Sequence, residues 1–227
     1  MKKFKKRLIK GLKNPLLILS FIRYKVFNLL TDKLLNDGER FDPNIFKKFW
    51  LKDVSSTERY VFAAKFVRTT DEILDIACGT GYGTFFLSQN CRRATGVDIF
   101  APAIEFAVKK YQQNKNISFV NTGLLANSVQ ADVVVSFETI EHLDEDLKMV
   151  VEKLVSFSRR QLIASVPYLE ASGHNRHHRK FSLQESDFSF LREQGKLDFF
   201  YQDSRGRITP EFMANAQTLL FVFTKNL

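Results

Sequence analysis

Apolar residues gather in short runs along this chain, and helix-like stretches separate the runs. Apolar runs of about four to eight residues, many of them β-branched, predict buried strands. The stretches at residues 102–111 and 145–157 read as helices, and Pro102 suits a first helical turn because its missing N–H would be unpaired there. The strands are predicted at residues 73–77, 94–97, 117–120, 131–137, 160–167, 196–202 and 217–224. Such strand–helix alternation is typical of a doubly wound α/β fold.

One predicted strand leads directly into a glycine-rich turn. Gly79, Gly81 and Gly83 stand at alternate positions after residues 73–77, and a helix-like pattern follows them. Glycine permits positive φ and lets a ligand approach the backbone closely, while the start of a helix offers unpaired N–H donors. The arrangement predicts a seat for a nucleotide-like ligand. A tight turn that binds nothing is the simpler alternative.

Two acidic residues favour the ligand seat. Asp75 lies inside the predicted strand, where a buried carboxylate is costly unless it has a partner. Asp98 ends the next apolar run, 19 residues after Gly79, where an acid can accept hydrogen bonds from a pair of ribose hydroxyls. We therefore expect both carboxylates to belong to a nucleotide site.

The run Asp75-Ile76-Ala77-Cys78-Gly79-Thr80-Gly81 resembles the first motif of the class I S-adenosylmethionine-dependent methyltransferases, and Gly96-Val97-Asp98-Ile99 is similar to their second. A dehydrogenase would favour Gly-x-Gly-x-x-Gly, without an acid four residues before the first glycine. The resemblance implies S-adenosylmethionine as cofactor, with the loop at its methionine half and the acid at its ribose. It also implies a mostly parallel, seven-stranded sheet whose last strand is antiparallel. The cofactor-binding residues expected from it are Tyr60, Asp75, Ala77, Cys78, Gly79, Thr80, Gly81, Asp98, Ile99 and Glu138.

The chain departs from that family after the predicted third strand. Asn121-Thr122-Gly123-Leu124 stands where the family has a Gly-Asp pair whose acid reaches the adenine. Asn121 or a backbone N–H could serve in its place, so the adenine contacts stay open.

The strand at residues 131–137 ends in a polar loop that holds Glu138, Glu141 and His142. Chemistry in parallel sheets lies at the carboxyl ends of the strands, and this loop resembles the fourth motif of small-molecule O-methyltransferases. His142 is the candidate general base, because histidine titrates near neutrality. A histidine that only bonds the backbone is the alternative. Glu141 and His177 complete the predicted catalytic set.

The same loop predicts a divalent metal site. Glu138, Glu141 and His142, joined by His177 or His178, would supply two carboxylates and two imidazoles, and a metal there would hold and acidify a hydroxyl acceptor. Ubiquinone-pathway O-methyltransferases and small-RNA 2′-O-methyltransferases carry a similar Glu-x-x-Glu-His, although the later histidines match only loosely. Many metal-free relatives also keep a Glu-His at this position.

A polar insertion at residues 173–182 holds three of the four histidines. It follows the predicted fifth strand, whereas His142 follows the fourth. Neighbouring parallel strands send their loops to the same sheet edge, so we expect His142 and the His177–His178 pair to lie together above the cofactor. Ser182 and Glu185 form a predicted capping box for a helix that continues to residue 191.

The whole net charge of +9 lies on residues 1–35, which hold ten Lys or Arg and one Asp, while the rest holds 24 basic and 24 acidic residues. The segment is also apolar. Its uncharged run is shorter than the roughly 20 residues that a membrane-spanning helix needs, because charged residues interrupt it. It is predicted to bind an anionic membrane surface or to pack on the catalytic core as a helix; nucleic acid is the least favoured partner. The division expected is a basic amphipathic segment, 1–35, and a methyltransferase domain, 36–227.

The function expected from the resemblance is methyl transfer to a small-molecule or glycan-linked hydroxyl. Gly38-Glu39-Arg40-Phe41 and Glu58-Arg59-Tyr60-Val61-Phe62-Ala63 look like the lead-in of bacterial methyltransferases that accompany cell-surface polysaccharide synthesis, in which an Arg-Tyr pair can close over the cofactor. A cofactor-binding but inactive partner protein is the alternative. Cys78 and Cys91 fit no disulfide or metal pattern, which favours the cytoplasm, at the inner face of the membrane if residues 1–35 bind there. Nothing in the sequence indicates the oligomeric state.

Overall fold

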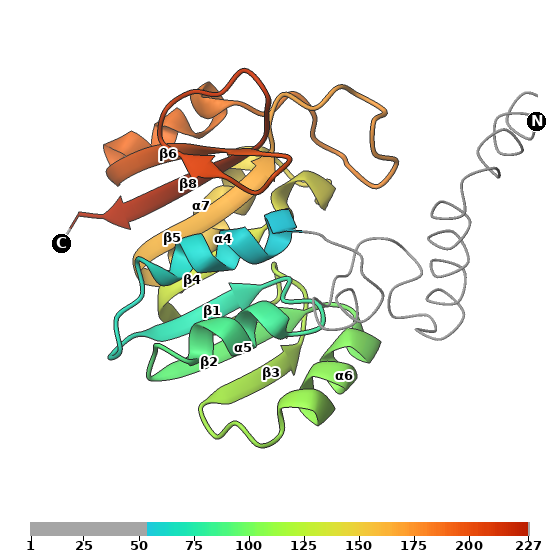
Figure 1. The fold of residues 1–227 in the computed structure, drawn as a ribbon, viewed down its shortest axis with the longest axis vertical. Coiled ribbons are helices and arrows are strands. Elements are labelled where there is room, and N and C mark those ends of the chain that lie inside the picture. The colour runs from blue at the N-terminus through green and yellow to red at the C-terminus, as the bar shows by residue number, and fades with distance from the viewer. Residues whose placement is uncertain (1–53, 227) are drawn as a thin grey trace, which may run out of the picture. The chain divides into compact units, whose positions relative to one another are not determined.

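An eight-stranded sheet organises the part of the chain that the computed structural model describes, residues 54–226 (Figure 1). The strands lie in the order β3-β2-β1-β4-β5-β8-β6-β7. The order reverses between β1 and β4, which is the switch point of a doubly wound fold. The strands are β1 (Glu72–Ile76), β2 (Arg93–Asp98), β3 (Ile117–Asn121), β4 (Ala131–Phe137), β5 (Ser158–Pro167), β6 (Gly195–Asp203), β7 (Ile208–Thr209) and β8 (Ala216–Lys225).

The strand directions confirm a mostly parallel sheet with an antiparallel last strand. The five strands from β3 to β5 pair in parallel, and β8 runs antiparallel between β5 and β6. The expected count of seven misses β7, a two-residue strand that pairs with Tyr201 and Gln202 of β6. The segment around β7 contains Gly206 and Pro210, and its sequence reads as a linker. A two-residue strand is too short to show an alternation of apolar and polar residues.

The helices are α4 (Val54–Ala64), α5 (Tyr82–Ser88), α6 (Ala101–Tyr111) and α7 (Leu147–Phe157), with two 3₁₀ segments, η1 (Ile140–His142) and η2 (Glu185–Glu193). The capping box expected from Ser182 and Glu185 is wrong. It forms two residues later, between Gln184 and Asp187. Ser182 has a φ of 56°, and its N–H instead donates to the carbonyl of Glu170, so it belongs to the preceding loop.

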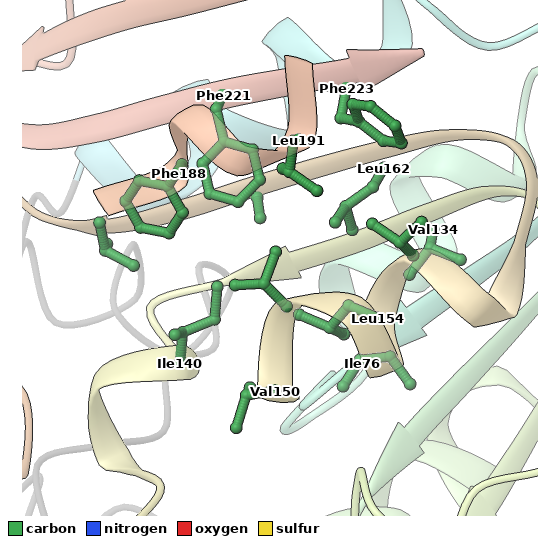
Figure 2. Packing of buried hydrophobic residues seen from close by; sticks show 14 of the residues in the cluster. Ile76, Val134, Ile140, Val150, Leu154, Leu162, Phe188, Leu191, Phe221 and Phe223 are labelled. Atoms are coloured by element: carbon green, nitrogen blue, oxygen red, sulfur yellow. The ribbon is translucent and has the colours of Figure 1, made fainter. Parts of the chain in front are cut away.

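The central strands β1, β4, β5 and β8 bury both faces, which is why their sequences are largely apolar. Leu74, Val134 and Leu162 join α7 and η2 in one buried cluster. Figure 2 shows Val134 and Leu162 among side chains of α7 and η2. Their neighbours along the strands, such as Ile73 and Ile163, join α4 and α5 in a second cluster on the other face. The sheet is therefore a rigid support whose loops present side chains at its edges.

Several sequence expectations concern residues 1–53, which lie outside the described part. They include the basic segment 1–35 and the Gly38–Phe41 lead-in. Among the described helices, none combines the length and apolar character that a membrane crossing requires.

Candidate active site

The loop between β1 and α5 has the glycine-type backbone that its sequence predicts. Ala77, Gly79 and Gly81 all have positive φ, of 60°, 53° and 76°. Space also requires glycine at residue 81, because a Cβ there would lie 2.6 Å from Phe119 Cε1. Ala77 has a side chain in a left-handed conformation that costs an L-residue roughly 1–2 kcal/mol. Strain at this turn indicates a loop whose shape serves a purpose beyond chain reversal.

Asp75 lies beneath this loop. Its carboxylate is fully buried and accepts hydrogen bonds from the hydroxyls of Thr84 in α5, at 2.6 Å, and Tyr60 in α4, at 3.2 Å. Burial raises the pKa of Asp75 to about 7, and the two hydroxyl donors limit the rise. Tyr60 reaches the carboxylate across Gly83, where a Cβ would lie 1.9 Å from the Tyr60 ring. These side chains join β1, α4 and α5 under the loop.

Asp98 connects the glycine loop to the loop that follows β2. Its Oδ2 accepts the N–H of Gly79 at 2.9 Å, and its Oδ1 accepts the N–H of Phe100 at 2.8 Å. A carboxylate can accept several hydrogen bonds, so Asp98 has the chemistry to accept ribose hydroxyls. The next residue, Ile99, is 74% exposed and offers an apolar surface beside them. The arrangement suits a nucleoside, with polar contacts on one side and an apolar contact on the other.

Asn121 supports these loops instead of reaching toward a base. Its amide nitrogen donates to the carbonyl oxygens of Asp98 and Ile99, both at 2.9 Å. Both amide hydrogens are thereby used, so the side chain can offer a ligand only its carbonyl oxygen. Cys78 and Thr80, the remaining predicted residues of the glycine loop, have buried side chains.

A second polar group lies where β4 and β5 end. Because β4 pairs in parallel with both β1 and β5, the loops after these three strands leave the same sheet edge. Glu141, His142 and His178 each bring one potential ligand atom within 4.8 Å of the others. The rings of His142 and His178 pack edge to face, with centroids 4.7 Å apart. The strand order thus brings the two histidine-bearing loops together, as expected.

Glu141 is the most unusual residue of this group. Its side chain is fully buried, and neither carboxyl oxygen has a hydrogen-bond partner among the described residues. Burial, followed by the nearby charge of Glu138, raises the pKa of Glu141 well above its usual range. Its backbone carbonyl accepts the N–H groups of Arg179, at 2.7 Å, and Lys180, at 3.1 Å. An unpartnered buried carboxyl is costly, so a donor or a cation from outside would stabilise it.

Glu138 lies at the same edge but contacts different residues. It has a φ of 49°, and its Oε1 accepts the hydroxyl of Ser165 at 2.8 Å. The guanidinium of buried Arg59 lies 4.0 Å from that oxygen and donates to Gln202 Oε1 at 3.0 Å. Glu138 therefore faces α4 and β5, outside the group of potential metal ligands formed by Glu141, His142 and His178.

His177 contributes its backbone to the group, while its ring lies elsewhere. The carbonyl oxygen of His177 is 3.3 Å from Nδ1 of His142. Its ring nitrogen Nε2 instead accepts from Arg176 Nε at 2.9 Å. The turn at this point, in which the N–H of His177 donates to Asn175 Oδ1, places the ring of the following residue, His178, against His142. The structure thus brings His178 into the place that the predicted set gave to His177.

The sequence analysis did not predict Glu170 and Asn175, two further residues that contact this group. Nδ1 of His178 lies 2.5 Å from Glu170 Oε2, and its Nε2 lies 2.9 Å from Asn175 Nδ2. No motif marks either residue. The available signal was the polar character of the insertion as a whole, together with the cost of burying a histidine without partners.

A family model described as a methyltransferase domain matches residues 73–160. Probable S-adenosylmethionine-dependent methyltransferases of two Mycobacterium tuberculosis strains are 26% identical over 117 residues, 51% of this chain. The match spans only 41% of the length of these curated relatives.

Solved structures with the same fold carry the cofactor or its product. The N-methyltransferase NodS from Bradyrhizobium japonicum WM9, in complex with S-adenosylhomocysteine, matches with a TM-score of 0.59 and 19% identity, over 74% of this chain and 84% of NodS. Magnesium protoporphyrin IX methyltransferase ChlM from Synechocystis PCC 6803, with bound S-adenosylmethionine, matches with a TM-score of 0.56 and 17% identity, over 76% of this chain and 78% of ChlM. At these identities the likeness concerns the fold alone.

Proposed function

We propose that this protein, a class I S-adenosylmethionine-dependent methyltransferase, transfers the cofactor's methyl group to a hydroxyl of a small-molecule or glycan-linked acceptor. The family assignment, expected from the motifs at Asp75–Gly81 and Gly96–Ile99, is confirmed by the matched family model and the shared fold. The choice of a hydroxyl rests on one observation. Glu141, His142 and His178 gather proton-accepting atoms at the sheet edge that carries the glycine loop.

Methyl transfer to a hydroxyl needs alignment of the reacting atoms and removal of a proton. The new C–O bond forms as the C–S bond breaks, and the sulfonium becomes a neutral thioether; alignment alone contributes roughly 7 kcal/mol or more in favourable cases. His142 suits the role of base. The His177 carbonyl near its Nδ1 can only accept, so a neutral His142 ring would carry its proton on Nδ1 and keep Nε2 as the basic nitrogen. The acceptor's proton would pass to that Nε2, which lies 3.9 Å from Glu141 Oε1.

A panel of acceptors tests this proposal. The protein is incubated with methyl-labelled S-adenosylmethionine and phenols, glycosides or primary amines, and mass spectrometry locates the label. We expect label on oxygen, and His142→Ala should lower kcat roughly 100-fold or more without changing affinity for S-adenosylhomocysteine. His177→Ala is the matched control, because it keeps the backbone carbonyl that His142 uses. Label on nitrogen alone contradicts the hydroxyl proposal, and no label despite cofactor binding supports the inactive-partner alternative.

A divalent metal at Glu141, His142 and His178 is a second candidate feature of the same site. The unpartnered, buried carboxyl of Glu141 is the observation that favours it. Two imidazoles and one carboxylate are a donor set that suits Zn²⁺, Mn²⁺ or Fe²⁺. The outer nitrogens of both rings contact oxygen acceptors, His177 O and Glu170 Oε2, as ligating histidines usually do. When bound, such an ion would hold a hydroxyl and lower its pKa.

Metal titration separates this candidate from the metal-free base. Mn²⁺ is added to chelator-treated protein without cofactor, and binding is followed by electron paramagnetic resonance. We expect Glu141→Gln and His178→Ala to abolish binding, whereas His177→Ala retains it. Because Asn175 Nδ2 donates to His178 Nε2, an ion on that nitrogen must displace the amide. Asn175→Asp removes that donor and keeps an Oδ1 acceptor for the His177 N–H, so it should not weaken binding. Turnover that survives chelation would contradict a metal role and leave His142 as base.

Residues 1–35 are proposed to hold the enzyme at an anionic membrane surface, near a lipid-linked substrate of cell-surface polysaccharide synthesis. The charge of +9 on this segment supports the proposal. Vesicles with anionic lipid should float the full protein and release the 36–227 form, and salt should weaken the attachment. The shortened form should still bind S-adenosylhomocysteine, because every cofactor residue lies later. Loss of cofactor binding in a folded 36–227 protein would favour the alternative in which residues 1–35 pack on the catalytic core as a helix. Flotation that does not depend on lipid charge would exclude electrostatic attachment to the membrane.

A further inference from the structure

Residues 169–183 form a closed loop that reaches the Glu141–His142 side of the site. Figure 1 shows this segment in orange as an extended loop between β5 and η2. Two backbone hydrogen bonds close it: Leu169 N donates to Leu183 O at 3.0 Å, and Ser182 N donates to Glu170 O at 2.9 Å. Leu169 and Ser182 have φ values of 52° and 56°. Strained residues at both ends indicate that the surrounding structure imposes the path of the loop.

The hydrogen bonds of Asn175 define which ring nitrogen of His178 carries the proton. The N–H of His177 can only donate, and it points at Asn175 Oδ1 at 3.0 Å, so that atom is the amide oxygen. The other end of the amide, Nδ2, is therefore a donor, and it lies 2.9 Å from His178 Nε2. A nitrogen that accepts cannot also carry a proton. The contacts of Asn175 thus place the ring proton of His178 on Nδ1.

Glu170 is the acceptor of that Nδ1 proton. Its Oε2 lies 2.5 Å from His178 Nδ1, and the side chains of Glu170 and His178 are only 13% and 8% exposed. A short hydrogen bond between two largely buried side chains is strong and directional. The ring it holds packs edge to face on His142, whose own Nδ1 faces the carbonyl of His177. Both contacts of His142 with the loop therefore depend on where this loop is held.

We infer that Glu170 is a positioning residue of the methyl-transfer site, which fixes the tautomer and orientation of His178 and, through the His178 ring and the His177 carbonyl, those of His142. Its consequence for His142 is that Nε2 faces Glu141, 3.9 Å from Oε1. The inference deepens the proposed hydroxyl methylation and rests on it only for the effect on turnover. The tautomer itself is a property of the protein without substrate.

Nitrogen-15 NMR of histidine-labelled protein measures the tautomer directly. The chain has four histidines, so His178→Gln assigns the signal. In the wild type with S-adenosylhomocysteine we expect His178 to show a protonated Nδ1 and a bare Nε2. Glu170→Gln should keep this pattern, because its amide oxygen still accepts, whereas Glu170→Leu should lose it. A wild-type His178 protonated at Nε2, or at both nitrogens, overturns the inference.

Kinetics then separate positioning from a merely structural role. With the acceptor found in the panel, Glu170→Leu should lower kcat about 10- to 100-fold, with KM and cofactor affinity within twofold, and Glu170→Gln should recover most of the loss. Glu193→Leu, an exposed glutamate of η2, is the matched control and should leave kcat unchanged. Unchanged kcat in a folded Glu170→Leu protein contradicts the inference.

If Glu170→Leu does not fold, the inference is tested instead by the tautomer of the wild-type protein and by the tautomer and kcat of Glu170→Gln. If no panel acceptor is methylated, the proposed function fails, while the NMR result still decides the tautomer.

Discussion

Replacing Asp75 by asparagine should remove a specific pH dependence from the stability of this protein. The side chain is fully buried, and its carboxylate accepts hydrogen bonds from Thr84 and Tyr60. Burial raises its pKa from the usual 3.8 to about 7. Asparagine has the same shape and does not titrate, so the difference between the two proteins isolates the ionisation of this one group.

The sign and size of this pH dependence of the free energy of unfolding follow from proton linkage. Between pH 4 and 7 the folded protein keeps the proton on Asp75, whereas the unfolded chain has lost it. The folded state therefore binds more protons, and its stability falls as pH rises through this window. With a folded pKa of about 7, the wild type should lose about 2.5 kcal/mol relative to Asp75→Asn between pH 5 and pH 8. Above pH 8 the difference should level off.

Urea unfolding of both proteins at pH 5, 6, 7 and 8 measures this difference. The free energy of unfolding of Asp75→Asn is subtracted from that of the wild type at each pH, which cancels every other titrating group. A difference that changes by less than about 0.5 kcal/mol across the range, or that rises with pH, would refute the reasoning. Either result would mean that the folded protein holds the carboxylate ionised, and that the two hydroxyl donors outweigh burial.

Three glycine-loop substitutions give further tests. Gly79→Arg should abolish S-adenosylhomocysteine binding in calorimetry, while Gly173→Arg, which imposes the same positive-φ strain at a site with nothing within 4 Å, should leave it intact. Gly83→Ala should destabilise the fold by about 2–3 kcal/mol in urea unfolding, because the added Cβ would lie 1.9 Å from the Tyr60 ring. Ala77→Gly should stabilise it by about 0.5–1 kcal/mol, since relief of the φ of 60° outweighs the greater flexibility of the unfolded chain.

The contacts around the glycine loop were predictable because they are local or follow strand order. Asp75 bonds Thr84 nine residues later, and Gly79 bonds Asp98 nineteen residues later, at the end of the neighbouring strand. Gly81 has a positive φ and no room for a Cβ, and the glycine in the sequence already indicates such a position. The central strands β1, β4, β5 and β8 were readable for a similar reason, since burial on both faces makes their sequences largely apolar.

The contacts around His142 were only partly predictable, because their geometry depends on turns whose hydrogen bonds are not local in sequence. Strand order brought His142 near the insertion, yet it did not distinguish His177 from His178. That choice depends on a turn at Asn175. Glu138 shows the same limit, because its left-handed backbone and its bond to Ser165 of β5 leave it outside the group of Glu141, His142 and His178. Local propensity carries no information about such contacts.

This difference indicates where acceptor specificity should be sought. The glycine loop lies between β1 and α5 and is bonded to Asp98 at the end of β2. The residues around His142 are held instead by the 169–183 loop, through the backbone bonds of Arg179 and Lys180 to Glu141 and the ring of His178. Loops vary more freely than the elements they connect. Exchanging residues 171–176, which are largely exposed and lie at the tip of the loop, should therefore change which acceptors are methylated while leaving S-adenosylhomocysteine affinity intact. An exchange that weakens cofactor binding as much as turnover would place this loop in the cofactor site instead.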